Sequence, residues 1–303
     1  LLKRVREWAR GSWQQGSTHF RREWAILIGD WLWRLVLPLM AVPLLFALAL
    51  ALSVPSRERA LLGFLSVLCC IWMGASLGLL SIAAERRVID HERLVFLNVF
   101  PYMSAKTLVL WILSLFQSLV FLAALWLFLW LPGHREDGLD GDGWMIVALV
   151  AVGFAGVGVG LLLSALSGTS VVTANFLLPL IMIAQIVFSA AIAIKIDSYQ
   201  EAYSCGFSWS SGPPAAKVSY LTLSRWGDMA VRPLQDGDRE VAWRTDYWWG
   251  VGVLGTVTII LPVLAGVMVW LGPWTRRILA RFWEAASTCG LSTSHTKHLA
   301  RTS

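Results

Sequence analysis

The feature that most constrains this chain is a set of six apolar runs, each long enough to cross a lipid bilayer. About 20 helical residues span the roughly 30 Å of hydrocarbon. Backbone polar groups in lipid must be satisfied within the segment, so such runs fold as helices. Composition agrees, since 57% of the residues are hydrophobic, 15% are charged and the mean hydropathy is +0.64. The sequence therefore predicts an all-α polytopic membrane protein. The six predicted transmembrane helices are Trp33–Leu52, Ala60–Ala84, Thr107–Leu131, Trp144–Leu166, Val172–Ile194 and Tyr247–Leu271.

The distribution of Lys and Arg predicts the orientation. An even number of spans puts both termini on one side, and that side carries 15 Lys and Arg. The other side carries nine, six of them in the long segment 195–246. Positive charge concentrates in cytoplasmic loops, and long loops count for little in this rule. We expect a multi-pass protein of the plasma (inner) membrane with both termini and Glu92 cytoplasmic and with Ser56, Gly138 and Cys205 outside.

Three regions follow from this layout. Residues 1–30 are basic and rich in Trp, which predicts an amphipathic helix at the membrane interface that connects to the first span. Residues 31–274 form the six-helix transmembrane domain, which includes the outer segment 195–246. Residues 275–303 form a basic cytoplasmic tail.

The second and third spans are separated by a strongly charged segment. Seven of the nine residues Glu85–Arg93 are ionisable, and each central charge in hydrocarbon costs roughly 2.5 kcal/mol or more. Val88 and Ile89 recur with Val95 and Phe96 on one helical face. The segment is therefore predicted to be a short amphipathic helix on the membrane surface.

Two glutamates in this segment lie on or beside its apolar face, where a plain surface helix would not place them. Glu85 and Glu92 therefore need partners. The basic residues available to Glu85 are its neighbours and those of the N-terminal helix: Arg86, Arg87, Arg21 and Arg22.

The same residues resemble a known family. Glu85 and Glu92 lie seven apart with basic residues between them, and Tyr102-Met103-Ser104-Ala105-Lys106 opens the next span. Two further matching stretches, Pro179–Ser189 and Ser219–Ala230, follow in order. Together these stretches resemble the permease domain of ABC exporters of the G subfamily, the white and pleiotropic-drug-resistance type.

The resemblance implies that ATP is bound by one chain or domain and that the membrane pathway is formed by another. ATP and Mg²⁺ would be bound by an ABC ATPase domain, fused upstream or separate, and a second permease copy would complete a dimer. The charged segment would be a coupling helix that receives force from the ATPase. Its coupling residues would be Glu85, Arg86, Arg87, His91, Glu92 and Arg93. The alternative is that these are solvated surface charges.

The resemblance also implies a pathway and a re-entrant segment. The second and fifth spans would face each other across a central cavity in the dimer, and the outer residues before the sixth span would dip into the membrane. An ordinary folded extracellular loop is the alternative for that outer segment. Pathway candidates, which could equally be packing or lipid-facing residues, are Met73, Phe176, Met182, Phe188, Ala191 and Ile192, with Ile186 beside them.

Other chemistry finds little support in the sequence. No phosphate-binding G-x-x-x-x-G-K-[ST] loop occurs, the five His are scattered without a Cys/His pairing, and no catalytic constellation lies within the spans. The dispersed basic residues match no nucleic-acid motif. Gly156 and Gly160, four apart inside a span, predict close helix packing rather than nucleotide binding.

We therefore expect the membrane subunit of an ATP-driven exporter for a hydrophobic or amphipathic, lipid-like substrate, with no catalytic, cofactor or metal site in this chain. The spans carry almost no charge, which suits such a cargo. The alternative is a non-transporting scaffold or assembly subunit that retains the permease fold. An adjacent ATPase sequence would distinguish the two.

Overall fold

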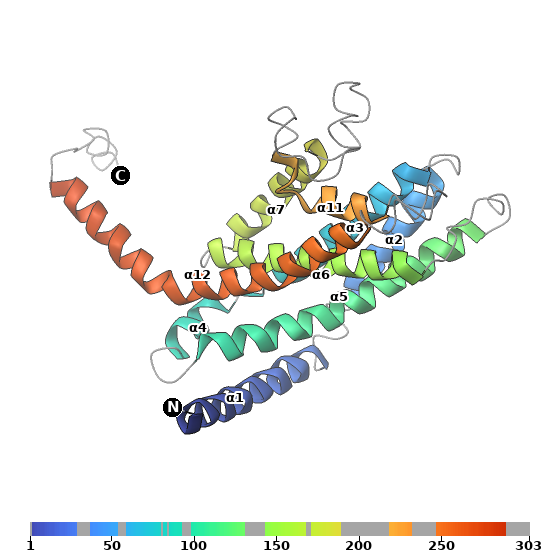
Figure 1. Ribbon diagram of the computed structural model, residues 1–303. Helices are drawn as coiled ribbons and strands as arrows, with labels where there is room; N and C mark the ends of the chain where they lie inside the picture. The colour runs from blue at the N-terminus through green and yellow to red at the C-terminus, as the bar shows by residue number, and fades with distance from the viewer. Residues whose placement is uncertain are drawn as a thin grey trace.

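The computed structural model describes residues 2–28, 37–53, 59–79, 81–83, 85–92, 98–130, 143–167, 171–188, 218–231 and 247–288. Every regular element in these ranges is a helix, as predicted (Figure 1). The helices are α1 Leu2–Ile28, α2 Leu37–Ser53, α3 Arg59–Leu79, α4 Arg86–Glu92, α5 Val99–Trp130, α6 Gly143–Leu166, α7 Val171–Val187, α11 Leu223–Val231 and α12 Trp248–Thr288.

Four of these helices are long and apolar enough to cross a membrane, over residues 61–79, 99–128, 143–166 and 248–272. They match four of the six predicted spans. The other two predictions are represented by the apolar segments Ala41–Leu50 and Val172–Val187, which are shorter than a full span. Both predicted spans continue into residues outside the described ranges, at 33–36 and at 189–194.

The centre of the bundle is the contact between α3 and α6, which is made by glycines. A Cβ atom at Gly156 would lie 2.8 Å from the carbonyl oxygen of Ile71, and one at Gly160 would collide with the backbone of Ala75. A Cβ at Gly78 on α3 would likewise lie 2.6 Å from the carbonyl oxygen of Val157. Glycine lets two helix backbones approach where a side chain would separate them. The predicted role of Gly156 and Gly160 in helix packing is confirmed.

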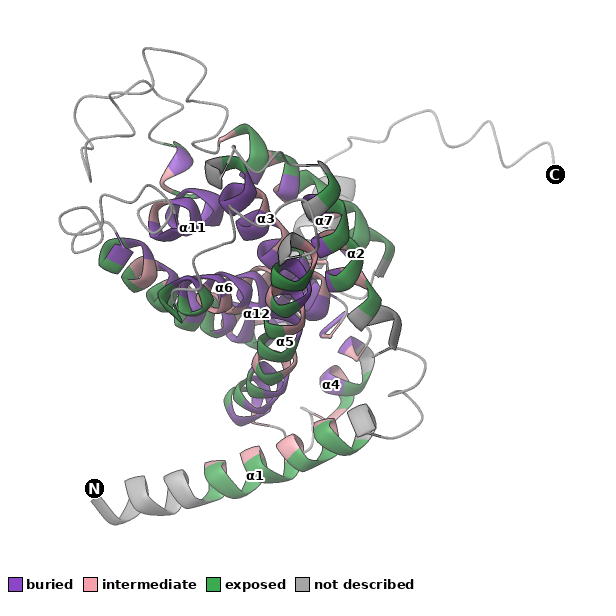
Figure 2. Ribbon diagram, turned by 90° about the vertical axis from the view of Figure 1, so that its right-hand side faces the viewer, coloured by how far each residue is buried: buried purple, intermediate pink, exposed green. Residues whose placement is uncertain are grey.

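The interfacial helix α1 lies outside the bundle. In Figure 2, where α5, α6 and α12 are seen nearly end-on, α1 crosses beneath them, with its less exposed side toward α5. Its most extensive contacts are with α5. Figure 1 shows that α4, the start of α5 and part of α1 gather at one end of the bundle, where α12 also bends away toward the C-terminus.

The described part of the segment before α12, residues 218–231, packs as part of the bundle. Helix α11 contacts α3, α6, α7 and α12, and eight of its nine residues are buried. Ser224 fastens it to α7, because its Oγ donates to the carbonyl oxygen of Gln185 at 2.7 Å and its backbone N–H donates to Oε1 of Gln185 at 2.9 Å. The buried guanidinium of Arg225 donates to Oγ of Ser219 at 2.7 Å and lies 3.9 Å from the ring centroid of Tyr220. These contacts attach α11 to α7 and fix the turn before it.

Candidate functional site: a charged cluster beside helix α4

The candidate site is a charged cluster around Lys106, near the start of α5. The Nζ atom of Lys106 lies 2.7 Å from Oε2 of Glu85, 3.2 Å from Oε1 of Glu23 and 3.0 Å from the hydroxyl oxygen of Tyr102. Lys106 is only 3% exposed. A buried charge is tolerated when it is paired and hydrogen-bonded, and this ammonium group has both kinds of partner. The cluster joins three segments that are far apart in sequence: α1, the turn before α4, and α5.

Tyr102 completes the cluster from the same face of α5, because residues four apart in a helix lie one above the other. Its hydroxyl group donates to Oε2 of Glu85 at 2.7 Å. That carboxylate oxygen therefore accepts two short hydrogen bonds, both of them charge-assisted because the acceptor is ionised. His19 of α1 packs edge-on against the Tyr102 ring, with 5.6 Å between ring centroids.

A second and weaker tie connects α1 to the far end of α4. Nη1 of Arg22 lies 3.4 Å from Oε1 of Glu92, and the two side chains are 42% and 37% exposed. An ion pair this exposed contributes about 0–1 kcal/mol. Helix α4 is therefore held firmly at its Glu85 end and loosely at its Glu92 end.

The body of α4 packs on protein as well. Ile89 is 2% exposed and belongs to a core cluster with residues of α5, α6 and α12, whereas Val88 is half exposed. The buried Arg86 side chain reaches the backbone of Gly272 on α12, where a Cβ would collide with the guanidinium group. The sequence predicted an amphipathic helix on a membrane surface, but in the structure Ile89 on its apolar face packs against the ends of the spans.

The turn between α3 and α4 is anchored by a side chain of α6. Oγ of Ser164 accepts hydrogen bonds from the backbone N–H groups of Ile82 at 3.0 Å and Ala83 at 2.8 Å. Buried backbone donors left without partners would be costly. Through this contact the exit of α3 moves together with α6.

Electrostatics favour the charged form of Glu85. Burial raises the pKa of Glu85, but the Lys106 ammonium group and the hydrogen bonds from Lys106 and Tyr102 outweigh this and hold the pKa below its usual value. The carboxylate therefore stabilises the folded state above its unfolded pKa of about 4.5, and this stabilisation is lost as the pH falls below that value.

His19 gives the cluster a pH dependence closer to neutrality. Burial, followed by the charge of Arg22, lowers its pKa below 6.5, although Glu92 and Glu23 act in the opposite sense. A depressed His pKa means that the neutral ring stabilises the folded state, and that this contribution is lost as the pH falls through 6.5 and below.

We expect the melting temperature of the purified protein to fall between pH 7.5 and pH 5.5, and to fall less in the His19→Gln variant. Equal slopes in the two proteins would contradict this account.

The structure brings together part of the predicted coupling set. Glu85, Arg86, His91 and Glu92 lie on or beside α4 at the α1 end of the bundle, with His91 exposed. The side chain of Arg87 and the whole of Arg93 are outside the described residues. Among the described residues, the ion pair of Glu85 is with Lys106, which was not one of its expected partners, and Arg22 pairs with Glu92.

The sequence identified Tyr102 and Lys106 as part of the family motif that opens the next span, but did not pair them with Glu85. Their spacing of four residues was the available signal that both project from one face toward the preceding turn. Glu23 and His19 were missed, and no local pattern in the N-terminal helix distinguishes them from its other polar residues.

The pathway candidates that the structure describes lie in different environments in the single chain. Met73 and Met182 are buried in the core at 2% and 4% exposure, whereas Phe176 is 76% exposed on α7. Phe188 lies at the end of α7, and Ala191 and Ile192 are outside the described residues. Because Met73 is packed, Met73→Trp would overpack the core, so this substitution cannot serve as a test of a pathway.

Comparison with known protein families matches residues 14–201 to the family described as ABC-2 type transporter. The match begins within α1 and extends past α7, and it includes every residue of the charged cluster. A comparison with curated proteins found no match to the chain.

Proposed function

The chain belongs to the ABC-2 type transporter family and is a membrane subunit of an ABC transporter; from this premise we propose that it is a G-subfamily-like exporter subunit. It works as a dimer and moves a hydrophobic or amphipathic, lipid-like substrate by alternating access. ATP and Mg²⁺ are bound by an ABC ATPase domain, fused to this chain or separate.

The observation that carries this proposal is the attachment of α4. A coupling helix transmits force only if it cannot slide relative to the spans. Here Glu85 is locked to α5 through Lys106, Ile89 sits in the core, and Ser164 of α6 holds the preceding turn. Glu92, at the loosely held end, is left to face the ATPase.

The α7 surface supports the proposed dimer. Its outer face presents a stripe of exposed apolar side chains at helical spacing: Val172, Phe176, Leu180, Ile183 and Val187. A second copy facing this stripe across the midline would create the central pathway expected from the family resemblance.

The charge content of the spans bears on the cargo. Lys106 is the one charged residue within the candidate spans of the described chain, which favours an apolar cargo over an ionic one.

The proposed orientation puts α1 and α4 in the cytoplasm and α11 on the outer side. We expect an impermeant maleimide applied to intact cells to label single cysteines at positions 56, 138 and 205, and to label one at position 92 only after permeabilisation. Labelling of position 92 from outside would reverse the orientation.

The function is tested by reconstitution. The chain is purified with the ATPase that accompanies it and placed in vesicles that contain a fluorescent phospholipid analogue. We expect ATP-dependent movement of the analogue between leaflets, abolished when the phosphate-binding Lys of the ATPase is replaced. Lack of a copurifying ATPase, together with lack of movement, would favour the scaffold alternative.

A further inference from the structure

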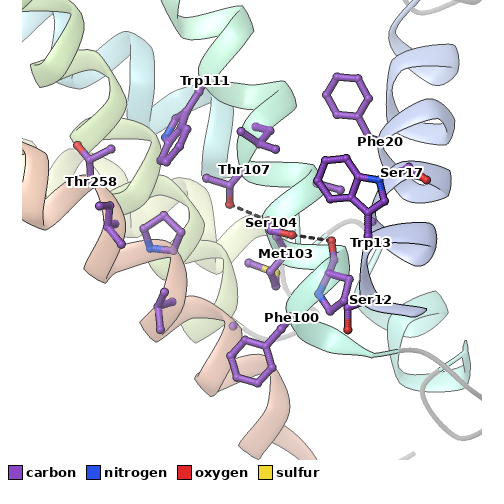
Figure 3. A pocket seen from close by; sticks show the side chains of 18 of the residues that line it. Ser12, Trp13, Ser17, Phe20, Phe100, Met103, Ser104, Thr107, Trp111 and Thr258 are labelled. Atoms are coloured by element: carbon purple, nitrogen blue, oxygen red, sulfur yellow. Dashed lines mark hydrogen bonds between the residues drawn. The ribbon is translucent and has the colours of Figure 1, made fainter. Parts of the chain in front are cut away.

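A pocket of about 880 Å³ lies between α1, α5 and α12, beside the charged cluster but not part of it. Figure 3 shows it from close by, with Trp13 and Phe20 of α1 facing Met103 and Trp111 of α5. Val263 of α12 closes another side. Helix α1 packs on α5, so this space separates it from α12. A volume of this size is typical of a small-molecule binding site.

The inside of the pocket offers little to a polar ligand. Its wall contains hydroxyl groups, but four of them donate to carbonyl oxygens of their own helices at 2.7–2.9 Å. These four are Ser17, Ser104, Thr107 and Thr258, and Figure 3 shows the bonds of Ser104 and Thr107. Hydroxyls satisfied in this way leave an apolar wall. The chemistry of the wall suits an alkyl chain.

The length of the pocket corresponds to one lipid leaflet. It follows α5 from Phe100 to Trp111, which is about 16 Å of helix at 1.5 Å per residue. This is about half of the roughly 30 Å hydrocarbon thickness.

A positive charge lies at the rim of the pocket, on α1. Arg21 of α1 lines the pocket and is exposed. The neighbouring basic residues Arg22 and Lys106 are already paired with carboxylates, whereas no ion pair joins Arg21 to any residue that the structure describes. Basic side chains at such sites bind anionic lipid headgroups.

We propose that this pocket binds one anionic phospholipid from the leaflet next to α1, with an acyl chain between α5 and α12 and the phosphate group at Arg21. The bound lipid fills the space between α1 and α12 and so braces α1, whose adjacent face carries Glu23 and Arg22 of the charged cluster. The site is distinct from the proposed cargo pathway, which lies on α7.

The chain offers a matched pair of variants. A Cβ at Gly266 would make ordinary contact with Met103 at 3.5 Å, so Gly266→Leu fits the backbone and places its side chain in the pocket. Gly255, on the same helix, has no atom within 4 Å of its Cβ position and is outside the pocket, so Gly255→Leu is the control. Arg21→Gln removes the charge and Arg21→Lys retains it.

Binding is measured by native mass spectrometry of the purified protein titrated with dioleoyl phosphatidylglycerol or dioleoyl phosphatidylcholine. We expect one preferred phosphatidylglycerol per chain. Gly266→Leu should weaken its binding at least about tenfold by occupying the space, whereas Gly255→Leu should not change it. Arg21→Gln should weaken it about fivefold, the typical effect of one basic residue on an anionic lipid, and Arg21→Lys should restore it.

Unchanged phosphatidylglycerol binding in Gly266→Leu would overturn the site, and equal binding of the two lipids by the unmodified protein would overturn the headgroup assignment. A photoactivatable phosphatidylglycerol should crosslink to α1, α5 or α12, and crosslinks confined to α7 would also overturn the proposal. The measurement needs neither ATP nor transport. Its failure would therefore leave the proposed exporter function standing.

Discussion

Gly160→Val is expected to prevent stable assembly of the bundle. Even a Cβ at this position would collide with the Ala75 backbone, so α3 and α6 must move apart. Overpacking against rigid backbone costs typically about 1–3 kcal/mol, and Gly156 and Gly78 also make close backbone approaches in this contact. About 3 kcal/mol corresponds to a fall of roughly 5 °C in Tm for a chain of this size. Tm and the yield of monodisperse protein in detergent measure the effect.

Gly255→Val is the matched control, since it adds the same side chain to an apolar helix at a position with open space around it. It should leave Tm and yield close to those of the unmodified protein. If Gly160→Val were equally well tolerated, the close approach of α3 and α6 would be refuted.

Glu85→Gln is expected to abolish transport while ATP hydrolysis continues. The substitution removes the charge that Lys106 binds at 2.7 Å, but Glu23 remains as a counter-ion and the amide retains hydrogen-bonding capacity. The protein should therefore fold, while the rigid link from α4 to α5 is weakened. We expect at least a tenfold lower transport rate per ATP hydrolysed in reconstituted vesicles. Wild-type transport by Glu85→Gln would refute the coupling role.

Substitution of Lys106, the ion-pair partner of Glu85, tests the contribution of this pair to the stability of the protein. Lys106→Met leaves the carboxylates of Glu85 and Glu23 without their shared cation, and breaking a buried pair this way costs about 3–5 kcal/mol. The variant that combines Glu85→Gln with Lys106→Met should lose less stability than the summed losses of the two single variants, since the two residues contact each other.

Glu92→Ala removes only an exposed ion pair. It should leave Tm nearly unchanged but impair coupling, because we propose that Glu92 faces the ATPase.

Much of this architecture could be predicted from sequence because a segment within hydrocarbon must be long, apolar and nearly free of charge. Apolar length identified the spans of α3, α5, α6 and α12, and the density of charge in Glu85–Arg93 placed that segment outside the membrane. The Gly156 and Gly160 spacing identified a packing face in the same way. Each of these signals is local, so neighbours along the chain are enough to reveal it.

The partners in the charged cluster were decided only by the tertiary structure. Glu85 had several basic neighbours in sequence, yet it pairs with Lys106, 21 residues away, while Glu23 reaches the same ammonium group from α1. The burial of Met73 and the pocket beside Arg21 likewise depend on how the helices cross. Hydropathy determines which segments enter the membrane, whereas partner choice depends on distances of a few ångströms between helices, which the order of residues along one helix does not specify.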